Sequence, residues 1–106
     1  MTPLHDLAYL FGGAFLANAL PHLTSALMGK PFQSPFAKPP GEGLSSSMVN
    51  GIWGFANLLV GWLLLARVGQ FDIRSFEHAG AASLGVLLIT LMLANRFGRF
   101  NGGNLS

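Results

Sequence analysis

The sequence predicts an all-α integral membrane protein: three transmembrane helices in a small bundle, with a Pro/Phe-rich interfacial loop between the first two. Three runs without Asp, Glu, Lys or Arg predict the helices. These runs lie between Asp6 and Lys30, between Glu42 and Arg67, and between Glu77 and Arg96, and they contain 23, 24 and 18 residues. A helix needs roughly 20 mostly apolar residues to cross a bilayer, and it satisfies its own backbone hydrogen bonds there.

Composition supports the same class of protein. Charged residues make up 9% of the 106 residues, against about 25% in soluble domains. A soluble helical domain is the alternative fold, but so few charges would not solvate its surface. The net charge of +2 comes from scattered basic residues, so we expect no nucleic-acid partner. The length predicts a single membrane domain over residues 1–106.

The first helix is predicted over about residues 4–28. Pro3 suits a first-turn position, where a missing N–H costs nothing, and Pro21 is expected to kink the helix. A cleaved signal peptide is the alternative interpretation of this segment. It is disfavoured because the amino end carries Asp6 and lacks the basic residues of a signal sequence.

The loop over residues 29–47 holds four of the six prolines, which excludes a continuous helix. Pro31, Phe32, Pro35 and Phe36 lie beside lysines, a composition suited to the headgroup region of a bilayer. The loop is therefore predicted to be either a connector on the membrane surface or a semi-rigid docking segment for a partner or a lipid. Serines before position 48 are good N-caps and predict a second helix over about residues 48–66.

The third helix is predicted over about residues 77–97, after a short polar turn. Lys30, Lys38, Arg96 and Arg99 then flank one face of the membrane, whereas Arg67 and Arg74 flank the other. Basic residues are more frequent on the cytoplasmic side. The count predicts a multi-pass protein with its N-terminus outside and its C-terminus in the cytoplasm.

Four polar residues within the helices are candidate site residues: Asn18, His22, Asn50 and Asn57. Asn18 and His22 are four residues apart and share one helix face, and Asn50 and Asn57 share a stripe of the second helix. Facing stripes would form interhelical hydrogen bonds that hold the helices together. The alternative is a small polar pocket that opens toward the first loop, with His22 as a ligand or proton carrier.

Small residues predict close helix packing. Gly12, Gly13, Gly51, Gly54, Gly61 and Gly85 are the candidate helix-packing positions. Small residues let helix backbones approach closely, which drives association when lipid is as apolar as the protein. The pattern fits a compact bundle, an oligomer or docking against another subunit.

We expect no enzyme, no metal site and no cofactor. The sequence holds no nucleophile–base spacing, no phosphate-binding glycine loop and no metal motif. The favoured function is a non-catalytic accessory or assembly subunit that packs against itself or another membrane protein. The alternative is small-molecule or lipid binding or transport by an oligomer, through a polar pocket around His22. Redox support, with His5, His22 or His78 at a haem or near a quinone, is the third hypothesis.

Overall fold

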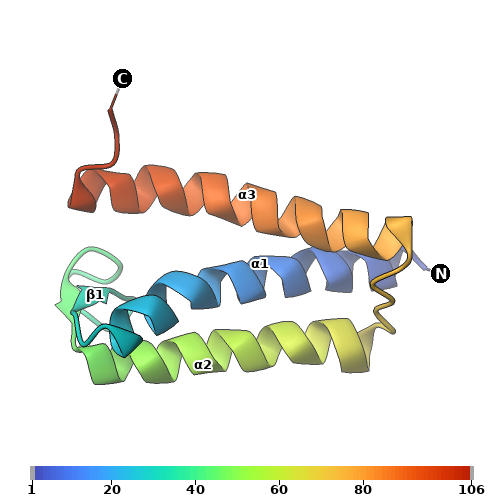
Figure 1. The fold of residues 1–106 in the computed structure, drawn as a ribbon, viewed down its shortest axis with the longest axis horizontal. Helices are drawn as coiled ribbons and strands as arrows, with labels where there is room; N and C mark the ends of the chain where they lie inside the picture. The colour runs from blue at the N-terminus through green and yellow to red at the C-terminus, as the bar shows by residue number, and fades with distance from the viewer. Residues whose placement is uncertain (1, 106) are drawn as a thin grey trace.

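The computed structural model describes residues 2–105, which form three long helices (Figure 1). The helices are α1 (Pro3–Leu27), α2 (Ser47–Leu63) and α3 (Phe76–Asn101). A π-helical turn, η1 (Leu64–Val68), extends α2, and two short strands, β1 (Phe32–Gln33) and β2 (Leu44–Ser45), pair within the first loop. The prediction of a mostly helical chain with three helices is confirmed for the described residues.

Hydroxyl side chains cap the start of each helix. The side-chain oxygens of Thr2, Ser46 and Ser75 accept hydrogen bonds from the backbone N–H groups of His5, Val49 and His78, over 3.2, 3.2 and 3.1 Å. Each bond satisfies a backbone donor that has no partner inside its helix. Pro3 occupies the first turn of α1, and the helix continues through Pro21 without a break.

Two helix ends differ from the predicted ones. The α-helical part of α2 stops at Leu63, and the π-helical turn carries the chain on to Val68 rather than Ala66. α3 continues past Phe97 to Asn101, because the arginines of its last turns are good helix formers even though they end the apolar pattern. The helix ends at Gly102, whose φ of +81° is the left-handed conformation that glycine adopts most easily.

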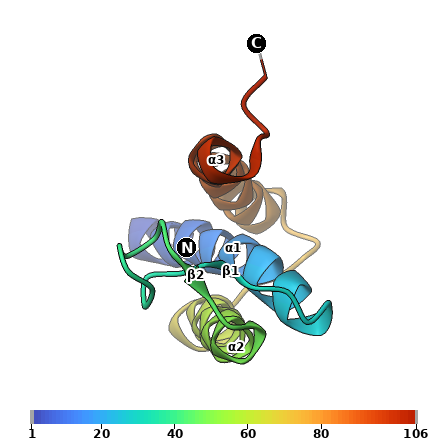
Figure 2. The same ribbon diagram turned by 90° about the vertical axis from the view of Figure 1, so that its left-hand side faces the viewer.

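The three helices form a flat row with α1 in the middle, antiparallel to α2 and parallel to α3 (Figure 1). α1 packs along both neighbours, whereas α2 and α3 hardly touch each other (Figures 1 and 2). The described chain measures 41 × 33 × 22 Å. α1 is therefore covered by protein on two sides, and α2 and α3 each have only one covered face.

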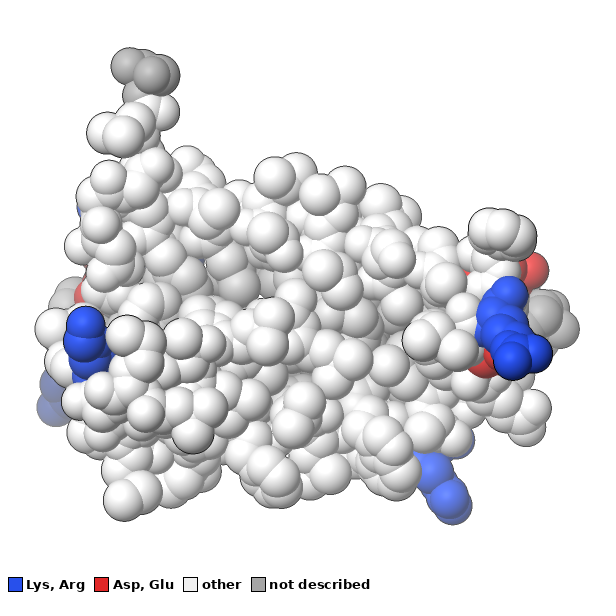
Figure 3. Space-filling model, viewed as in Figure 1, with Lys and Arg blue, Asp and Glu red and all other residues white. Residues whose placement is uncertain are grey.

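The interior of this row contains small and polar residues, and the exterior is apolar. Asn50 and Asn57 are at most 1% exposed and His22 is 2% exposed, whereas Ile52, Phe55 and other large apolar side chains of α2 and α3 are mostly exposed. A soluble domain buries such side chains instead. Charged side chains gather at the two ends of the molecule and leave the middle of the visible face uncharged (Figure 3).

Two helical segments among the described residues, 47–68 and 76–101, are long and apolar enough to cross a membrane. In the most apolar 18-residue stretch of each segment, only 22% and 11% of the residues are buried in the chain. α1 has 25 residues, but its most apolar 18-residue stretch is less apolar than those of these two segments. Small and polar residues of α1 are buried, and this helix contacts both of the others.

Candidate functional site

Two side-chain pairs join α1 to α2. Asn18 Nδ2 donates to Asn57 Oδ1 over 2.8 Å, and His22 Nδ1 lies 2.6 Å from Asn50 Oδ1. Asn57 Nδ2 also donates to the Trp53 carbonyl within its own helix, over 2.8 Å. The structure thus brings the four polar residues together as two bonded pairs rather than as one open cluster.

Asn50 also attaches the first loop to α2. Its Nδ2 lies within 3.2 Å of three backbone carbonyl oxygens, those of Phe32, Ser45 and Ser46. Carbonyl oxygens only accept hydrogen bonds, so the amide nitrogen faces them and Oδ1 faces His22. His22 Nδ1 must therefore carry the hydrogen of this pair. In the neutral ring, Nε2 then keeps a free lone pair.

Aromatic rings surround His22. The centroids of Phe32, Phe97 and Trp53 lie 5.6, 6.3 and 6.4 Å from the imidazole, each with its plane at 73° or more to it. Phe32 and Phe97 are themselves 4.7 Å apart. These rings come from the first loop, α3 and α2, so every element at this end of the molecule helps to fix the imidazole.

The first loop is folded over this end of the helices. The hydroxyl oxygens of Ser34 and Ser45 lie 2.6 Å apart, and this contact holds the β1–β2 end of the loop closed. Among the predicted loop residues, Phe32 points inward to His22 and Phe36 packs edge-on against Trp53 at 5.2 Å. Pro31 and Pro35 are exposed.

A cavity of about 150 Å³ lies beside His22. Its polar and aromatic lining includes Asn18, His22, Gln33, Trp53, Arg96 and Phe97. Asn50 and Asn57 do not line it; they hold His22 and Asn18 from the α2 side. The cavity is smaller than the roughly 300–1,000 Å³ of sites for drug-sized ligands, so a haem does not fit there.

No family model, no curated protein and no solved structure matches this chain.

Sequence reasoning missed Gln33 and Arg96 as lining residues. Gln33 is 4% exposed, and its Oε1 accepts a hydrogen bond of 3.0 Å from Asn101 Nδ2. Arg96 was assigned to the membrane surface because it ends a charge-free run. No spacing in the sequence relates positions 33 and 96 to His22, since their approach depends on the path of the first loop.

The predicted helix-packing glycines lie at contacts within the chain. A Cβ atom at Gly13 would overlap the Ala82 carbonyl, and one at Gly85 would overlap the Leu10 carbonyl oxygen. On the α2 side the nearest atoms belong to side chains: Leu65 at Gly12, Leu23 at Gly54, Leu16 at Gly61, and Ala26 at 3.3 Å from Gly51. These glycines set the distances between helices of one chain.

The opposite end of the molecule holds a second aromatic cluster. Tyr9 is fully buried; its hydroxyl accepts a hydrogen bond of 2.9 Å from the Gln70 N–H, and its ring lies 4.4 Å from His78 and 5.6 Å from Phe71. His78 Nδ1 accepts the Asp72 N–H over 2.9 Å. Tyr9 and His78 thus anchor the turn between η1 and α3. Within residues 2–105, no three His, Asp or Glu side chains are grouped as metal ligands.

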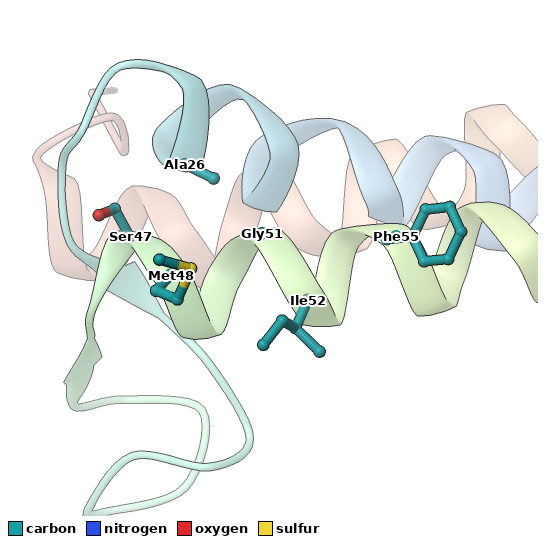
Figure 4. Close-up of a pocket in the computed structure, with 6 residues that line it drawn as sticks. All are labelled: Ala26, Ser47, Met48, Gly51, Ile52 and Phe55. Carbon is teal, nitrogen blue, oxygen red and sulfur yellow. The ribbon is translucent and has the colours of Figure 1, made fainter.

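A shallow hollow of about 410 Å³ lies over the contact between α1 and α2 (Figure 4). Ala26 comes from α1, and Ser47, Met48, Gly51, Ile52 and Phe55 come from α2. Its lining is almost wholly apolar and holds no group of converging polar atoms. It is therefore less suited to a polar ligand than the cavity beside His22.

Proposed function

We propose that the chain is a multi-pass integral membrane protein in which α1, α2 and α3 all cross the bilayer. The observation that carries this proposal is the reversed distribution of side chains, with amides and imidazole inside and large apolar groups outside. α1 is included because it runs between two apolar helices and, at 1.5 Å per residue, its 25 residues extend about 37 Å, more than the ~30 Å hydrocarbon core.

The orientation follows from the basic residues at the two ends. Lys30, Lys38, Arg96 and Arg99 belong to the end formed by the first loop and the last turns of α3, and Arg67 and Arg74 belong to the other end. The positive-inside rule then gives a cytoplasmic C-terminus and an external N-terminus.

Within the membrane, the protein acts as a non-catalytic accessory or assembly subunit. Its intramembrane amides are already bonded in pairs, which is how polar residues stabilise helix packing. The flat row also leaves a groove of about 530 Å³ between η1 and α3, across α1. The α3 side of this groove carries the small residues Ala79, Ala82, Ser83 and Thr90. Small residues admit a neighbouring helix, from a second copy or from another membrane protein.

Filling this groove is expected to weaken assembly. Ser83 is exposed and lines the groove, so Ser83→Leu blocks the approach of a helix while keeping α3 apolar enough to insert. We expect the affinity between subunits to fall about tenfold or more, as when about 1.4 kcal/mol of packing is lost. Native mass spectrometry from nanodiscs measures the stoichiometry, and dilution of labelled protein in liposomes measures the affinity.

The matched control is Leu91→Phe, an exposed position of α3 outside the groove. It should assemble like the parent chain. A parent chain that is monomeric in nanodiscs and carries no stoichiometric protein partner contradicts the assembly proposal. Equal assembly of the parent chain and Ser83→Leu places the contact elsewhere and contradicts the role of the groove.

A further inference from the structure

We infer that the cavity beside His22 binds an oxyanion that carries a hydrogen, such as inorganic phosphate or the phosphate monoester of a lipid headgroup. The site lies within one chain, on α1, α2, α3 and the first loop. It does not depend on the assembly proposed above.

Arg96 supplies the positive charge. Its Nη2 lies 2.6 Å from the position that a Cβ atom would take at Gly41, and Gly41 lines the same cavity. Within residues 2–105, no carboxylate oxygen lies within 4 Å of this guanidinium. The centroid of the Phe100 ring lies 5.8 Å from its Cζ atom. Glu42 follows Gly41 in the loop but is exposed. Arginine stays charged at every physiological pH, so the half-buried group has a charge that an anion can balance.

His22 supplies an acceptor. Its Nε2 has no hydrogen-bond partner within residues 2–105. Among the described residues, Asp6 Oδ1 is the one fully buried polar side-chain atom without a hydrogen-bond partner. Because His22 Nε2 also has no partner, it is not fully buried, and it is accessible from the cavity that His22 lines. In the neutral imidazole with its hydrogen on Nδ1, Nε2 accepts a hydrogen bond and repels a bare anionic oxygen. The ligand must therefore present an O–H group there.

Gln33 supplies a further donor. Asn101 Nδ2 donates to both the Phe97 carbonyl and Gln33 Oε1, which fixes the direction of the Gln33 amide. Gln33 Nε2 has no hydrogen-bond partner within residues 2–105, and Gln33 lines the cavity. A charged donor, a neutral donor and one acceptor suit an anion with several oxygens and at least one hydroxyl.

The size and depth of the cavity agree with this ligand. About 150 Å³ is the volume of an engineered cavity that holds benzene, so a five-atom tetrahedral oxyanion fits. Arg96 lies 19 residues after Glu77 on α3, or about 29 Å along the helix at 1.5 Å per residue. The cavity is therefore near the headgroup level of the proposed membrane orientation, where both a free anion and a lipid phosphate can reach it.

Titration of the full chain in a neutral maltoside detergent tests the inference. Inorganic phosphate is added and binding is followed by calorimetry at neutral pH, with sulfate as the tetrahedral control that carries no hydrogen. Native mass spectrometry with added phosphatidic acid, and with phosphatidylcholine as the control, tests the lipid source. Arg96→Gln removes the charge, and Arg99→Gln removes an exposed charge one turn away.

We expect phosphate to bind at least about tenfold more tightly than sulfate, or phosphatidic acid at least about tenfold more tightly than phosphatidylcholine. Arg96→Gln should reduce the affinity for the ligand that binds by about tenfold or more, as when a charged hydrogen bond is lost. Arg99→Gln should change the affinity less than twofold. Binding of phosphate alone identifies a free anion, and binding of phosphatidic acid alone identifies a lipid. The inference is wrong if neither binds, if Arg96→Gln retains full affinity with unchanged helix content, or if sulfate binds as well as phosphate.

Discussion

Gly85→Ala is expected to separate α1 from α3 and to destabilise the chain by about 3 kcal/mol, the upper part of the range for overpacked interiors. The added methyl group would overlap the carbonyl oxygen of Leu10, which is backbone and cannot rotate away. The α1–α3 contact includes a second glycine of this kind, Gly13 against the Ala82 carbonyl. Reversible unfolding in mixed micelles measures the loss of free energy.

Gly80→Ala is the matched control on the same helix. No atom lies within 4 Å of the position of its new methyl group, and the position is exposed. Alanine is the better helix former by about 1 kcal/mol, so this variant should be as stable as the parent chain or more stable. Equal stability of the two alanine variants would contradict the close α1–α3 contact.

The second large effect is expected for Asn50→Leu, which should destabilise the chain by about 2–3 kcal/mol and release the first loop. The amide bonds His22 and three backbone carbonyls, and leucine leaves all of them without this partner. Bonds of this kind contribute about 0.6–2 kcal/mol each within membranes. Hydrogen exchange should rise across residues 29–47, while the middle of α2 stays protected.

Asn95→Leu is the control for this change. Asn95 is exposed on α3 and its side chain forms no hydrogen bond within the described residues. Its substitution should leave both stability and loop exchange unchanged. If hydrogen exchange across residues 29–47 is as slow in Asn50→Leu as in this control, the Asn50 amide does not hold the first loop. The geometry of the cavity beside His22 would then lose its support.

Much of the fold follows from local features of the sequence. The charge-free runs and the capping serines locate the helices within a few residues, because both features act within one helix. The four-residue spacing of Asn18 and His22 likewise puts them on one face, and the structure places that face against α2.

The remaining features depend on contacts between distant segments. α1 lies between the other two helices, a position that the sequence does not reveal. Gln33 and Arg96 meet at the cavity because Asn50 and the Ser34–Ser45 pair fold the first loop back over the helix ends. Gly54 and Gly61 resemble a motif for association between chains, yet they contact α1 of the same chain. The motif alone does not say which helix is the partner.

Crossing of the membrane by all three helices is the central claim, and cysteine labelling tests it most directly. The chain contains no cysteine, so Leu4→Cys, Glu42→Cys and Ile73→Cys each introduce one thiol at an exposed position without changing any Lys or Arg. A membrane-impermeant maleimide should label positions 4 and 73 on intact cells, and position 42 only after permeabilisation. Labelling of positions 4 and 42 from the same side would show that α1 does not cross the bilayer, and equal labelling of all three on intact cells would contradict a membrane-spanning fold.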